Sequence, residues 1–378
     1  MLKPRHLSLG LAPVVGRLAR GYARTLNVHS RPSQPTSQGP TPTLIAGVQA
    51  SESIHIGNYL GCIQPFLEAQ QQSQEAGVRS FFVVADQHAL HEVLLPKPFS
   101  QIDPQIGLHT RSALALLIAC GIDPKKTTLF LQSHVPMVYE LMWNLTCVSS
   151  LHSMKSDPIF KGASKAWALA GQTLYPVLMA ADIILFKSTH VAIGPDMNSH
   201  LDFAIESAKR MNRVCGKEIF PECQSTEKKP WLIRNLRNSD FKMSKSDPVE
   251  KNKVGLLDSP DAARQKLLRA KTDSEGAFSA DPSRIELLNL VHIYAGFRKV
   301  SAQTIQKQYE GVSLPTFKRE MSDFVAQEIA KIQENYYVLL EDEAFLEEVI
   351  ELGRLRALEA AAPTLDEVKH SFGYLNIH

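Results

Sequence analysis

The amino-acid sequence predicts an α/β fold in which a parallel sheet covered by helices is followed by an all-helical region. Short apolar runs alternate with helical patterns in the first part of the chain, and from about Ser259 only helical patterns occur. Strands that alternate with helices are typical of parallel sheets. The length of 378 residues suggests two domains, because a domain commonly holds about 100–200 residues.

Four apolar runs are expected to be strands, namely Leu44–Val48, Phe81–Ala85, Thr128–Gln132 and His190–Ile193. Helical patterns in the same part of the chain cover residues 58–75, 105–120 and 197–212. Ligands of parallel sheets bind beyond the carboxyl ends of the strands. We therefore expect the functional residues just after these strands.

The second part of the chain carries helix signals only. Ser259 is predicted to be an N-cap, with Pro260 at the first helical position. Thr364 and Glu367 form a capping box, which predicts the start of the last helix. Two apolar stripes at helical spacing are interpreted as core packing, one from Leu287, Leu290, Val291 and Tyr294, the other from Phe317, Met321, Phe324 and Val325.

Composition excludes several classes of protein. No apolar run approaches the roughly 20 residues of a membrane-spanning helix. The net charge is only +2, so any nucleic acid must be bound by local patches. The five cysteines include no C-x-x-C pair, which argues against a disulfide framework or a zinc site. They are expected to be packing residues in a reducing compartment.

Residues 1–40 are interpreted as a mitochondrial transit peptide and a disordered linker. The first acidic residue is Glu52, and the basic residues before it are Lys3, Arg5, Arg17, Arg20, Arg24 and Arg31. A basic, acid-free and amphipathic segment is typical of transit peptides. Residues 30–42 are rich in Ser, Pro and Gln, as disordered linkers are. A disordered basic tail without a targeting role is the alternative.

The first expected strand leads into a turn that suits an anion. His55-Ile56-Gly57-Asn58 follows residues 50–53 and opens a helix. The free backbone N–H groups and the dipole of a helix start both favour a phosphate. A glycine at position 57 would let an adenine ring lie close to the backbone. Alone, the motif is equally consistent with an ordinary turn between strand and helix.

A second motif lies at residues 241–248, Phe-Lys-Met-Ser-Lys-Ser-Asp-Pro. Two lysines three positions apart, with serines between and after them, suit a loop that closes over phosphates. The lysines would supply charge and the serines hydrogen bonds. A solvated basic loop is the alternative.

Together, H-x-G-N near the start of the nucleotide fold and K-M-S-K-S after its last strand resemble the class I aminoacyl-tRNA synthetases. The segment Leu174–Ile183 is similar to the pattern Y-P-x-L-M-A-A-D-I of the tryptophan-specific branch. The resemblance runs from about residue 43 to the C-terminus and is dense through residue 248. Further matching stretches are Ile56–Gly61, Asp86–His88, Cys120–Pro124, Gln132–Ser133 and Thr272–Gly276.

The resemblance implies a Rossmann-like nucleotide-binding domain over residues 41–255 and a helical tRNA (anticodon)-binding domain over residues 256–378. It implies a tryptophan–tRNA ligase, which converts L-tryptophan and ATP to tryptophanyl-adenylate and pyrophosphate and then loads tRNA(Trp). Mg²⁺ is expected on the ATP phosphates, with no metal site of the protein itself. A homodimer without membrane contact is also implied. The predicted transit peptide implies that the protein lies in the mitochondrial matrix.

By the same resemblance, the catalytic residues are Lys242, Lys245 and Asn58. The ATP-binding residues are Gln49, Ala50, Ser51, Gly57, Asn58, Gly194, Pro195, Asp196, Ile233, Lys242, Met243, Ser244, Lys245 and Ser246. The tryptophan-binding residues are Asp182, Met179, Tyr175, Gln49 and His88. Candidate tRNA contacts, for which a solvated helix face is the alternative, are Lys251, Lys253, Lys266, Arg269 and Lys271.

The role of Asp182 also follows from the chemistry of tryptophan. The indole N–H is the one polar group of that side chain, and a buried carboxylate can accept it. Sites built on such a bond discriminate against analogues that lack it by about 10⁴-fold or more. Asp182 follows an apolar stretch, which suits this task. A charge exposed on a helix is the alternative.

Three residues depart from the family pattern. Glu52 replaces the last glycine of G-x-Q-P-[ST]-G, Met197 replaces the glutamine of G-E-D-Q that helps hold the amino acid, and Ile45 replaces a phenylalanine. They indicate either a diverged organellar enzyme or a catalytically impaired paralogue that acts as an RNA-binding protein. The active enzyme is favoured because the two lysines, Gly57, Asn58 and Asp182 remain.

Two other functions are less consistent with these motifs. A tyrosine-specific synthetase of the same architecture is disfavoured by the Met-Ala-Ala-Asp segment at 179–182. A simple adenylyltransferase could share the H-x-G turn, but it would not need the helical C-terminal region.

Overall fold

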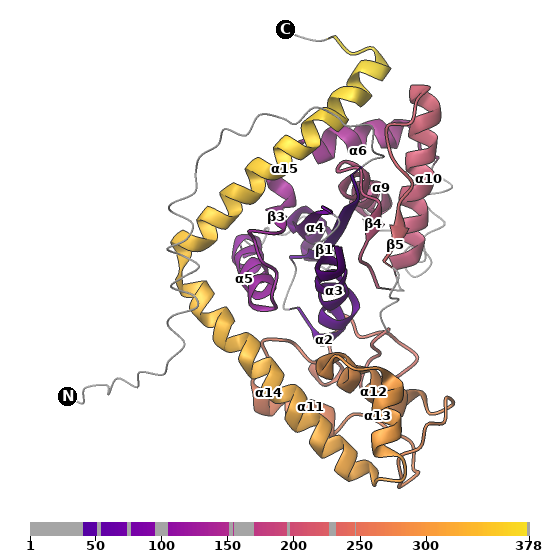
Figure 1. Cartoon of the computed structure of the whole chain (residues 1–378), viewed down its shortest axis with the longest axis vertical. Coiled ribbons are helices and arrows are strands. Elements are labelled where there is room, and N and C mark those ends of the chain that lie inside the picture. The colour runs from indigo at the N-terminus through magenta and orange to yellow at the C-terminus, as the bar shows by residue number, and fades with distance from the viewer. Residues whose placement is uncertain are drawn as a thin grey trace, which may run out of the picture. The chain divides into compact units, whose positions relative to one another are not determined.

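A parallel five-stranded sheet in the order β3-β2-β1-β4-β5 lies at the centre of the fold (Figure 1). The structure is a computed structural model that describes residues 41–50, 54–73, 77–94, 105–150, 154, 170–194, 197–226, 232–245 and 247–375. The strands are β1 (Thr43–Gln49), β2 (Arg79–Ala85), β3 (Thr128–Leu131), β4 (His190–Val191) and β5 (Gln224–Ser225). All neighbouring pairs are parallel, which confirms the predicted parallel sheet.

The four predicted strands correspond to β1–β4, with ends that differ by one or two residues. The register between β1 and β2 is uniform, from Thr43 beside Arg79 to Gln49 beside Ala85. The edge strand β5 escaped prediction because it consists of two polar residues, which carry no apolar run. The predicted leader at residues 1–40 lies outside the described residues.

Helices cover both faces of the sheet. In this first part of the chain they are α2 (Ile56–Asn58), α3 (Gln64–Ser73), α4 (Asp86–Leu94), α5 (Ile106–Ala119), α6 (Met137–Val148), α9 (Ala170–Ile184) and α10 (Asn198–Cys215). Ile45, Phe81 and Phe130 join one hydrophobic core with α6, α9 and α10. On the opposite face, Phe66 of α3 meets Phe82 of β2 edge to face, with ring centroids 5.0 Å apart. Alternate strand residues therefore serve two cores.

The predicted helices are present with small shifts. The helix expected over 58–75 begins at Ile56 as α2 and passes through a single π-helical segment, Tyr59–Ile63, before it continues as α3. Those expected over 105–120 and 197–212 are α5 and α10. A short 3₁₀ turn, Gln132–His134, follows β3. It turns the chain at the carboxyl edge of the sheet.

The C-terminal part is helical, as predicted. Its helices are α11 (Pro260–Leu268), α12 (Ile285–Arg298), α13 (Ala302–Tyr309), α14 (Leu314–Glu341) and α15 (Glu343–Phe372), preceded by a 3₁₀ turn at Glu250–Asn252. The Ser259 side chain accepts from the Ala262 N–H at 3.2 Å, so the predicted cap is confirmed. Both apolar stripes face inward, with only Phe324 less than fully buried.

The predicted capping box at Thr364 and Glu367 is wrong. Both residues lie inside α15, which runs without interruption from Glu343 to Phe372 and contains Pro363. Thr364 is buried, and the N-cap is Asp342, whose carboxylate accepts from the Phe345 N–H at 3.0 Å. The pattern Thr-x-x-Glu is local, whereas the continuous packing of α15 decides where the helix starts.

Helix α15 returns from the helical part to the sheet (Figure 1). Ala357, Ala361, Leu365 and Val368 of this helix belong to the same hydrophobic core as the strands. A Cβ atom added to Gly353 would lie 1.9 Å from the carbonyl oxygen of Leu129 in β3. Only glycine therefore permits this crossing. The described residues from Thr41 onward form one compact unit.

All five cysteines are free thiols, which confirms that no disulfide holds the fold. Among the described helices, none is both long and apolar enough to cross a membrane.

Candidate active site

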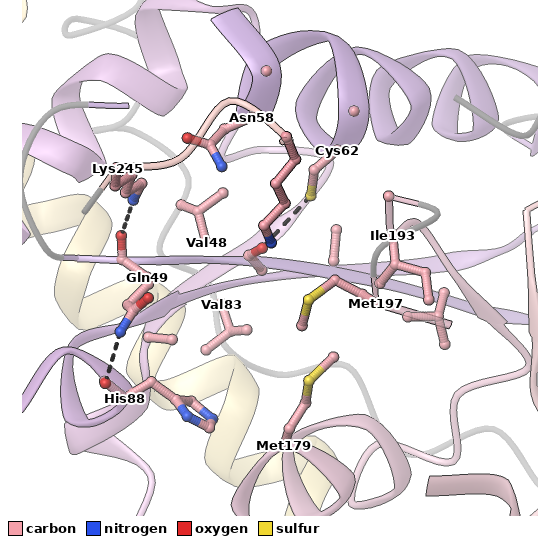
Figure 2. A pocket seen from close by; sticks show the side chains of 18 of the residues that line it. Val48, Gln49, Asn58, Cys62, Val83, His88, Met179, Ile193, Met197 and Lys245 are labelled. Carbon is pink, nitrogen blue, oxygen red and sulfur yellow. Dashed lines mark hydrogen bonds between the residues drawn. The ribbon is translucent and has the colours of Figure 1, made fainter. Parts of the chain in front are cut away.

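A cavity of about 330 Å³ opens where the strand order reverses, between the carboxyl ends of β1 and β4 (Figure 2). This switch point is where ligands of open parallel sheets bind. The lining residues come from these two strands and from β2, from α2 and the π-helical segment after it, from α4, α9 and the N-cap of α10, and from the loops over 193–194 and 232–245. The H-x-G-N and K-M-S-K-S motifs, nearly 200 residues apart in the sequence, therefore meet at one cavity.

His55 and Asn58 close the start of α2 in a reciprocal capping box. The Nδ1 atom of His55 accepts from the backbone N–H of Asn58, and the side-chain oxygen Oδ1 of Asn58 accepts from the backbone N–H of His55, both at 3.3 Å. Burial and then the charges of the nearby lysines lower the pKa of His55 to about 3. The imidazole is therefore neutral near pH 7 and keeps its lone pair for the cap.

Gly57 is required by a close contact within the motif itself. A Cβ atom at this position would lie 2.8 Å from two ring atoms of His55. The approach of an adenine ring to Gly57 stays a prediction. The contact with His55 is a second, sufficient reason for glycine here.

The lysine loop lies along the segment that contains Ile233 and reaches the end of β1. The Met243 N–H donates to the Ile233 carbonyl at 2.9 Å, and Arg234 and Lys242 form an antiparallel bridge. The Lys245 ammonium donates to the carbonyl of Gln49 at 2.7 Å (Figure 2). Lys242 and Lys245 both line the cavity. Two cationic side chains therefore stand beside the helix start that favours an anion.

Asp182 of α9 lies at the floor of the cavity and is 4% exposed. Its Oδ2 accepts from Gln132 Nε2 at 2.7 Å and from His88 Nε2 at 3.1 Å. Its Oδ1 is buried and has no partner among the described residues. Burial raises the pKa of Asp182, and the two hydrogen bonds oppose that rise. One oxygen is thus fixed and the other is available to accept a donor from a ligand.

The remaining walls are mostly apolar. Val83, Met179, Ile193 and Met197 face the cavity, and the two methionines point toward each other across it (Figure 2). Tyr175 also lines the cavity, with its ring edge-on to that of His88, centroids 4.4 Å apart. A flat apolar ring with one N–H donor fits between these walls, because a carboxylate oxygen lies at their end.

Known proteins agree with this geometry. The sequence family described as tRNA synthetases class I (W and Y) matches residues 37–335. The tryptophan–tRNA ligase of Caldanaerobacter subterraneus subsp. tengcongensis is 36% identical over 337 residues, which cover 88% of this chain and 98% of that protein. The corresponding ligase of Rickettsia conorii is 34% identical over 339 residues, with coverage of 88% and 99%. The chain belongs to the tryptophan–tRNA ligases of class I.

Solved structures of such synthetases share the fold. The tryptophanyl-tRNA synthetase of Mycoplasma pneumoniae gives a TM-score of 0.74 at 24% identity, over 89% of this chain and 99% of that one. The enzyme of Campylobacter jejuni, complexed with ADP and tryptophan, gives a TM-score of 0.67 at 28% identity, with coverage of 88% and 99%. The predicted Rossmann-like sheet followed by helices is therefore confirmed.

Most residues that the sequence assigned to the synthetase's site line this one cavity. They are Gln49, Gly57, Asn58, Gly194, Ile233, Lys242, Met243, Ser244 and Lys245 from the ATP set, and Asp182, Met179, Tyr175 and His88 from the tryptophan set. Ala50 does not line it, because its side chain is buried and its N–H donates to the Ala85 carbonyl at 3.3 Å. Ser51, Pro195, Asp196 and Ser246, and the departure Glu52, lie outside the described residues.

The other two family departures, Ile45 and Met197, both line the cavity. Gln132, which fixes Asp182, was part of a matching stretch but received no role. Its position directly after β3 could have revealed it, because residues that follow parallel strands lie at the same edge of the sheet. Asp86 and His88 follow the neighbouring strand β2 in the same way.

Two predicted tRNA contacts of the synthetase have partners within the chain instead. The side chains of Lys253 and Lys266 are only 11% and 15% exposed. Lys253 donates to the Lys245 carbonyl, and Lys266 to Asp258, both at 2.7 Å. Neither side chain belongs to a solvated surface, so the alternative of a solvated helix face is wrong for these two, and their contact with tRNA stays a prediction.

Proposed function

We propose that this synthetase activates L-tryptophan with ATP and transfers the tryptophanyl group to the 3′ end of tRNA(Trp) in mitochondrial translation. The buried and unpartnered Oδ1 of Asp182 at the end of an apolar cavity carries the assignment of tryptophan. Lys242 and Lys245 beside the start of α2 support ATP as the second substrate. The Campylobacter jejuni relative is described as complexed with ADP and tryptophan.

In the activation step the protein positions the substrates and stabilises charge rather than taking part in covalent chemistry. A carboxylate oxygen of tryptophan attacks the α-phosphorus of ATP, a new P–O bond forms, and the bond to pyrophosphate breaks. Negative charge moves onto the departing pyrophosphate. The ammonium groups of Lys242 and Lys245 stabilise that charge and hold the phosphates beside the start of α2.

The amino acid is held by groups whose orientation is already set. Asp182 Oδ1 accepts the indole N–H, and Met179 packs on the ring. The side-chain nitrogen of Gln49 donates to the His88 carbonyl at 2.8 Å (Figure 2). This bond turns the Gln49 amide oxygen into the acceptor for the substrate ammonium, with Tyr175 beside it. Substrate placement therefore needs little rearrangement.

Mg²⁺ is proposed as a partner of the ATP phosphates. The described residues contain no group of three or more His, Cys, Asp or Glu side chains that could hold a metal ion. The charged groups of the loop at the cavity are lysines, which repel a cation. The ion is therefore assigned to the substrate phosphates.

In the transfer step, tRNA is the acceptor. A ribose hydroxyl of the tRNA end attacks the adenylate carbonyl, and AMP leaves. We propose that the helical part beyond residue 256 contacts the tRNA and that the enzyme acts as a homodimer, as the family resemblance implies.

Mitochondrial localisation is proposed from the acid-free, basic first 51 residues. Residues 1–40 fused to a fluorescent reporter are expected to direct it to the mitochondrial matrix, where a protease added to intact organelles cannot reach it. The matched control replaces the six basic residues of this segment by glutamine and is expected to stay in the cytosol. Equal distribution of the two fusions would contradict the proposal.

The ligase activity is tested by ATP–pyrophosphate exchange with the purified chain from residue 41 onward. Exchange with tryptophan, but not with tyrosine or phenylalanine, is the expected result. A folded protein that shows no exchange with any amino acid would favour the catalytically impaired paralogue, because Ile45 and Met197 both line the cavity.

A further inference from the structure

Lys253 is a buried cation that the reaction itself does not use. Its side chain is 11% exposed and does not line the cavity. Its ammonium donates to the backbone carbonyl of Lys245 at 2.7 Å and pairs with Glu250 at 3.2 Å. A buried ammonium is unfavourable unless it is hydrogen-bonded. The contact that secures it here is made to the catalytic loop.

The backbone next to Lys253 is attached to the other motif. The Ile56 N–H donates to the Val254 carbonyl at 2.9 Å, and the Leu256 N–H donates to the Ile54 carbonyl at 2.8 Å. His55 and Gly255 form the antiparallel bridge between them. Lys253 therefore projects from a segment whose position is fixed relative to the H-x-G-N helix start.

Lys253 thus connects the two motifs through one short path. From the segment paired with residues 54–56, its ammonium reaches the carbonyl of Lys245, whose own ammonium reaches the carbonyl of Gln49 at 2.7 Å. Both lysines also contribute to the low pKa of His55. The Lys253 bond acts at the Lys245 backbone itself, beyond the points at which Lys242 and Met243 pair with residues 233–234.

Lys266 offers a natural comparison. It is 15% exposed, shares Glu250 with Lys253 at 3.7 Å, and donates to Asp258 at 2.7 Å. No contact joins it to the described residues of the lysine loop. The two lysines therefore match in burial and in acidic partner and differ in the contact with Lys245.

We propose that Lys253 is a positioning residue for activation, which holds the lysine loop over the cavity at a fixed distance from the helix start. This inference rests on the proposed function and adds to it a residue outside both motifs. Lys253 acts through Lys245, because it does not line the cavity. It should therefore affect the use of ATP and leave tryptophan binding unchanged.

The test compares Lys253→Met with Lys266→Met in ATP–pyrophosphate exchange. Lys253→Met is expected to lower kcat/KM for ATP by roughly 10- to 100-fold, the size expected when a hydrogen bond of a charged group is lost. The KM for tryptophan should not change. Lys266→Met should stay within about fivefold of the wild type, since partly exposed ion pairs contribute little. Lys253→Arg, which keeps a cationic donor, should restore most of the activity.

Equal kinetics of the two methionine variants would overturn the proposal, as would an equal rise in the KM for both substrates. If Lys253→Met has a lower melting temperature than Lys266→Met, the Lys253→Arg variant decides. A normal kcat/KM for ATP in Lys253→Arg supports the positioning role. The full loss of kcat/KM in a folded Lys253→Arg protein overturns it. A wild type without exchange contradicts the proposed function alone. Amide hydrogen exchange over residues 241–245 then tests Lys253, since faster exchange only in Lys253→Met supports the role and equal exchange overturns it.

Discussion

At the scale of single residues, Asp182 shows how a buried carboxylate can select one ring. Its Oδ2 accepts from Gln132 and His88, and its Oδ1 is buried without a partner among the described residues. The charged form is costly at such a site, and burial raises the pKa accordingly. Two fixed donors keep the carboxylate oriented, so the remaining oxygen can discriminate between tryptophan and phenylalanine.

Asp182→Asn is therefore expected to impair tryptophan specifically. Gln132 must still donate, so the new amide would present its oxygen there and turn its NH₂ group toward the indole N–H. We expect kcat/KM for tryptophan to fall by about 10- to 100-fold, with the small activity toward phenylalanine unchanged. Exchange assays with both amino acids measure the ratio of kcat/KM for tryptophan to kcat/KM for phenylalanine. An unchanged ratio would mean that Asp182 does not select the indole ring.

His55 predicts a dependence of stability on pH. Its pKa of about 3 in the folded chain lies below the ordinary value near 6.5, so between these values the unfolded chain binds more protons. Stability is therefore full above about pH 6.5 and is lost as the pH falls toward 3. His55→Asn keeps an N-cap acceptor without a titrating group. Between pH 7 and 5 the wild type should lose about 2 kcal/mol more than this variant.

Urea unfolding at the two pH values measures that difference, and the comparison cancels the titration of all other groups. Equal losses in the two proteins would mean that His55 titrates normally in the fold.

Sequence reasoning located the residues that belong to local motifs. Lys242, Lys245 and Asp182 lie in recognisable motifs, and all three line the cavity. Lys253 was misread as a surface charge because its burial depends on the packing of residues 254–256 against 54–56. No local pattern reports a contact between segments so far apart in the sequence.

At the scale of elements, helix α15 packs closely on β3 because Gly353 has no side chain. Gly353→Ala would place a Cβ atom within 1.9 Å of the Leu129 carbonyl oxygen, so the helix must move away from the strand. Alanine normally stabilises a helix interior by about 0.5–1 kcal/mol relative to glycine. Here we expect a loss of about 2 kcal/mol or more, as for other overpacked cores.

Gly107 of α5 provides the matched control, since no atom lies within 4 Å of its added Cβ. Gly107→Ala should be neutral or slightly stabilising in the same thermal melts. Equal effects of the two substitutions would show that α15 does not need close contact with β3.

Errors in the predicted helices and strands also arise because local patterns do not report packing between distant segments. Apolar runs of ordinary length revealed β1–β4, but β5 is two polar residues paired with β4. The start of α15 was placed at Thr364 from a local capping pattern. The burial of Phe345, Leu346 and Val349, which a capping pattern does not report, extends that helix by more than 20 residues toward its N-terminus.

At the scale of the whole molecule, the sheet that carries the cavity depends on α15, which lies far along the chain from it. Leu365 and Val368 are buried in the core that also contains Ile45 and Phe130. Burial of such side chains contributes about 1.5–3 kcal/mol each, against a total stability of about 5–15 kcal/mol for typical proteins. A catalytic sheet deprived of this helix would expose an apolar face.

A chain that ends at Glu341 should therefore lose cooperative unfolding and ATP–pyrophosphate exchange together, although it retains every residue that lines the cavity. The control ends at Tyr374, whose hydroxyl donates to Asn144 at 2.9 Å, and should match the wild type because Leu375 is almost fully exposed. Calorimetry and exchange assays follow both properties. A shortened chain that exchanged pyrophosphate normally would mean that the sheet and its N-terminal helices fold alone, and that α15 serves the helical part.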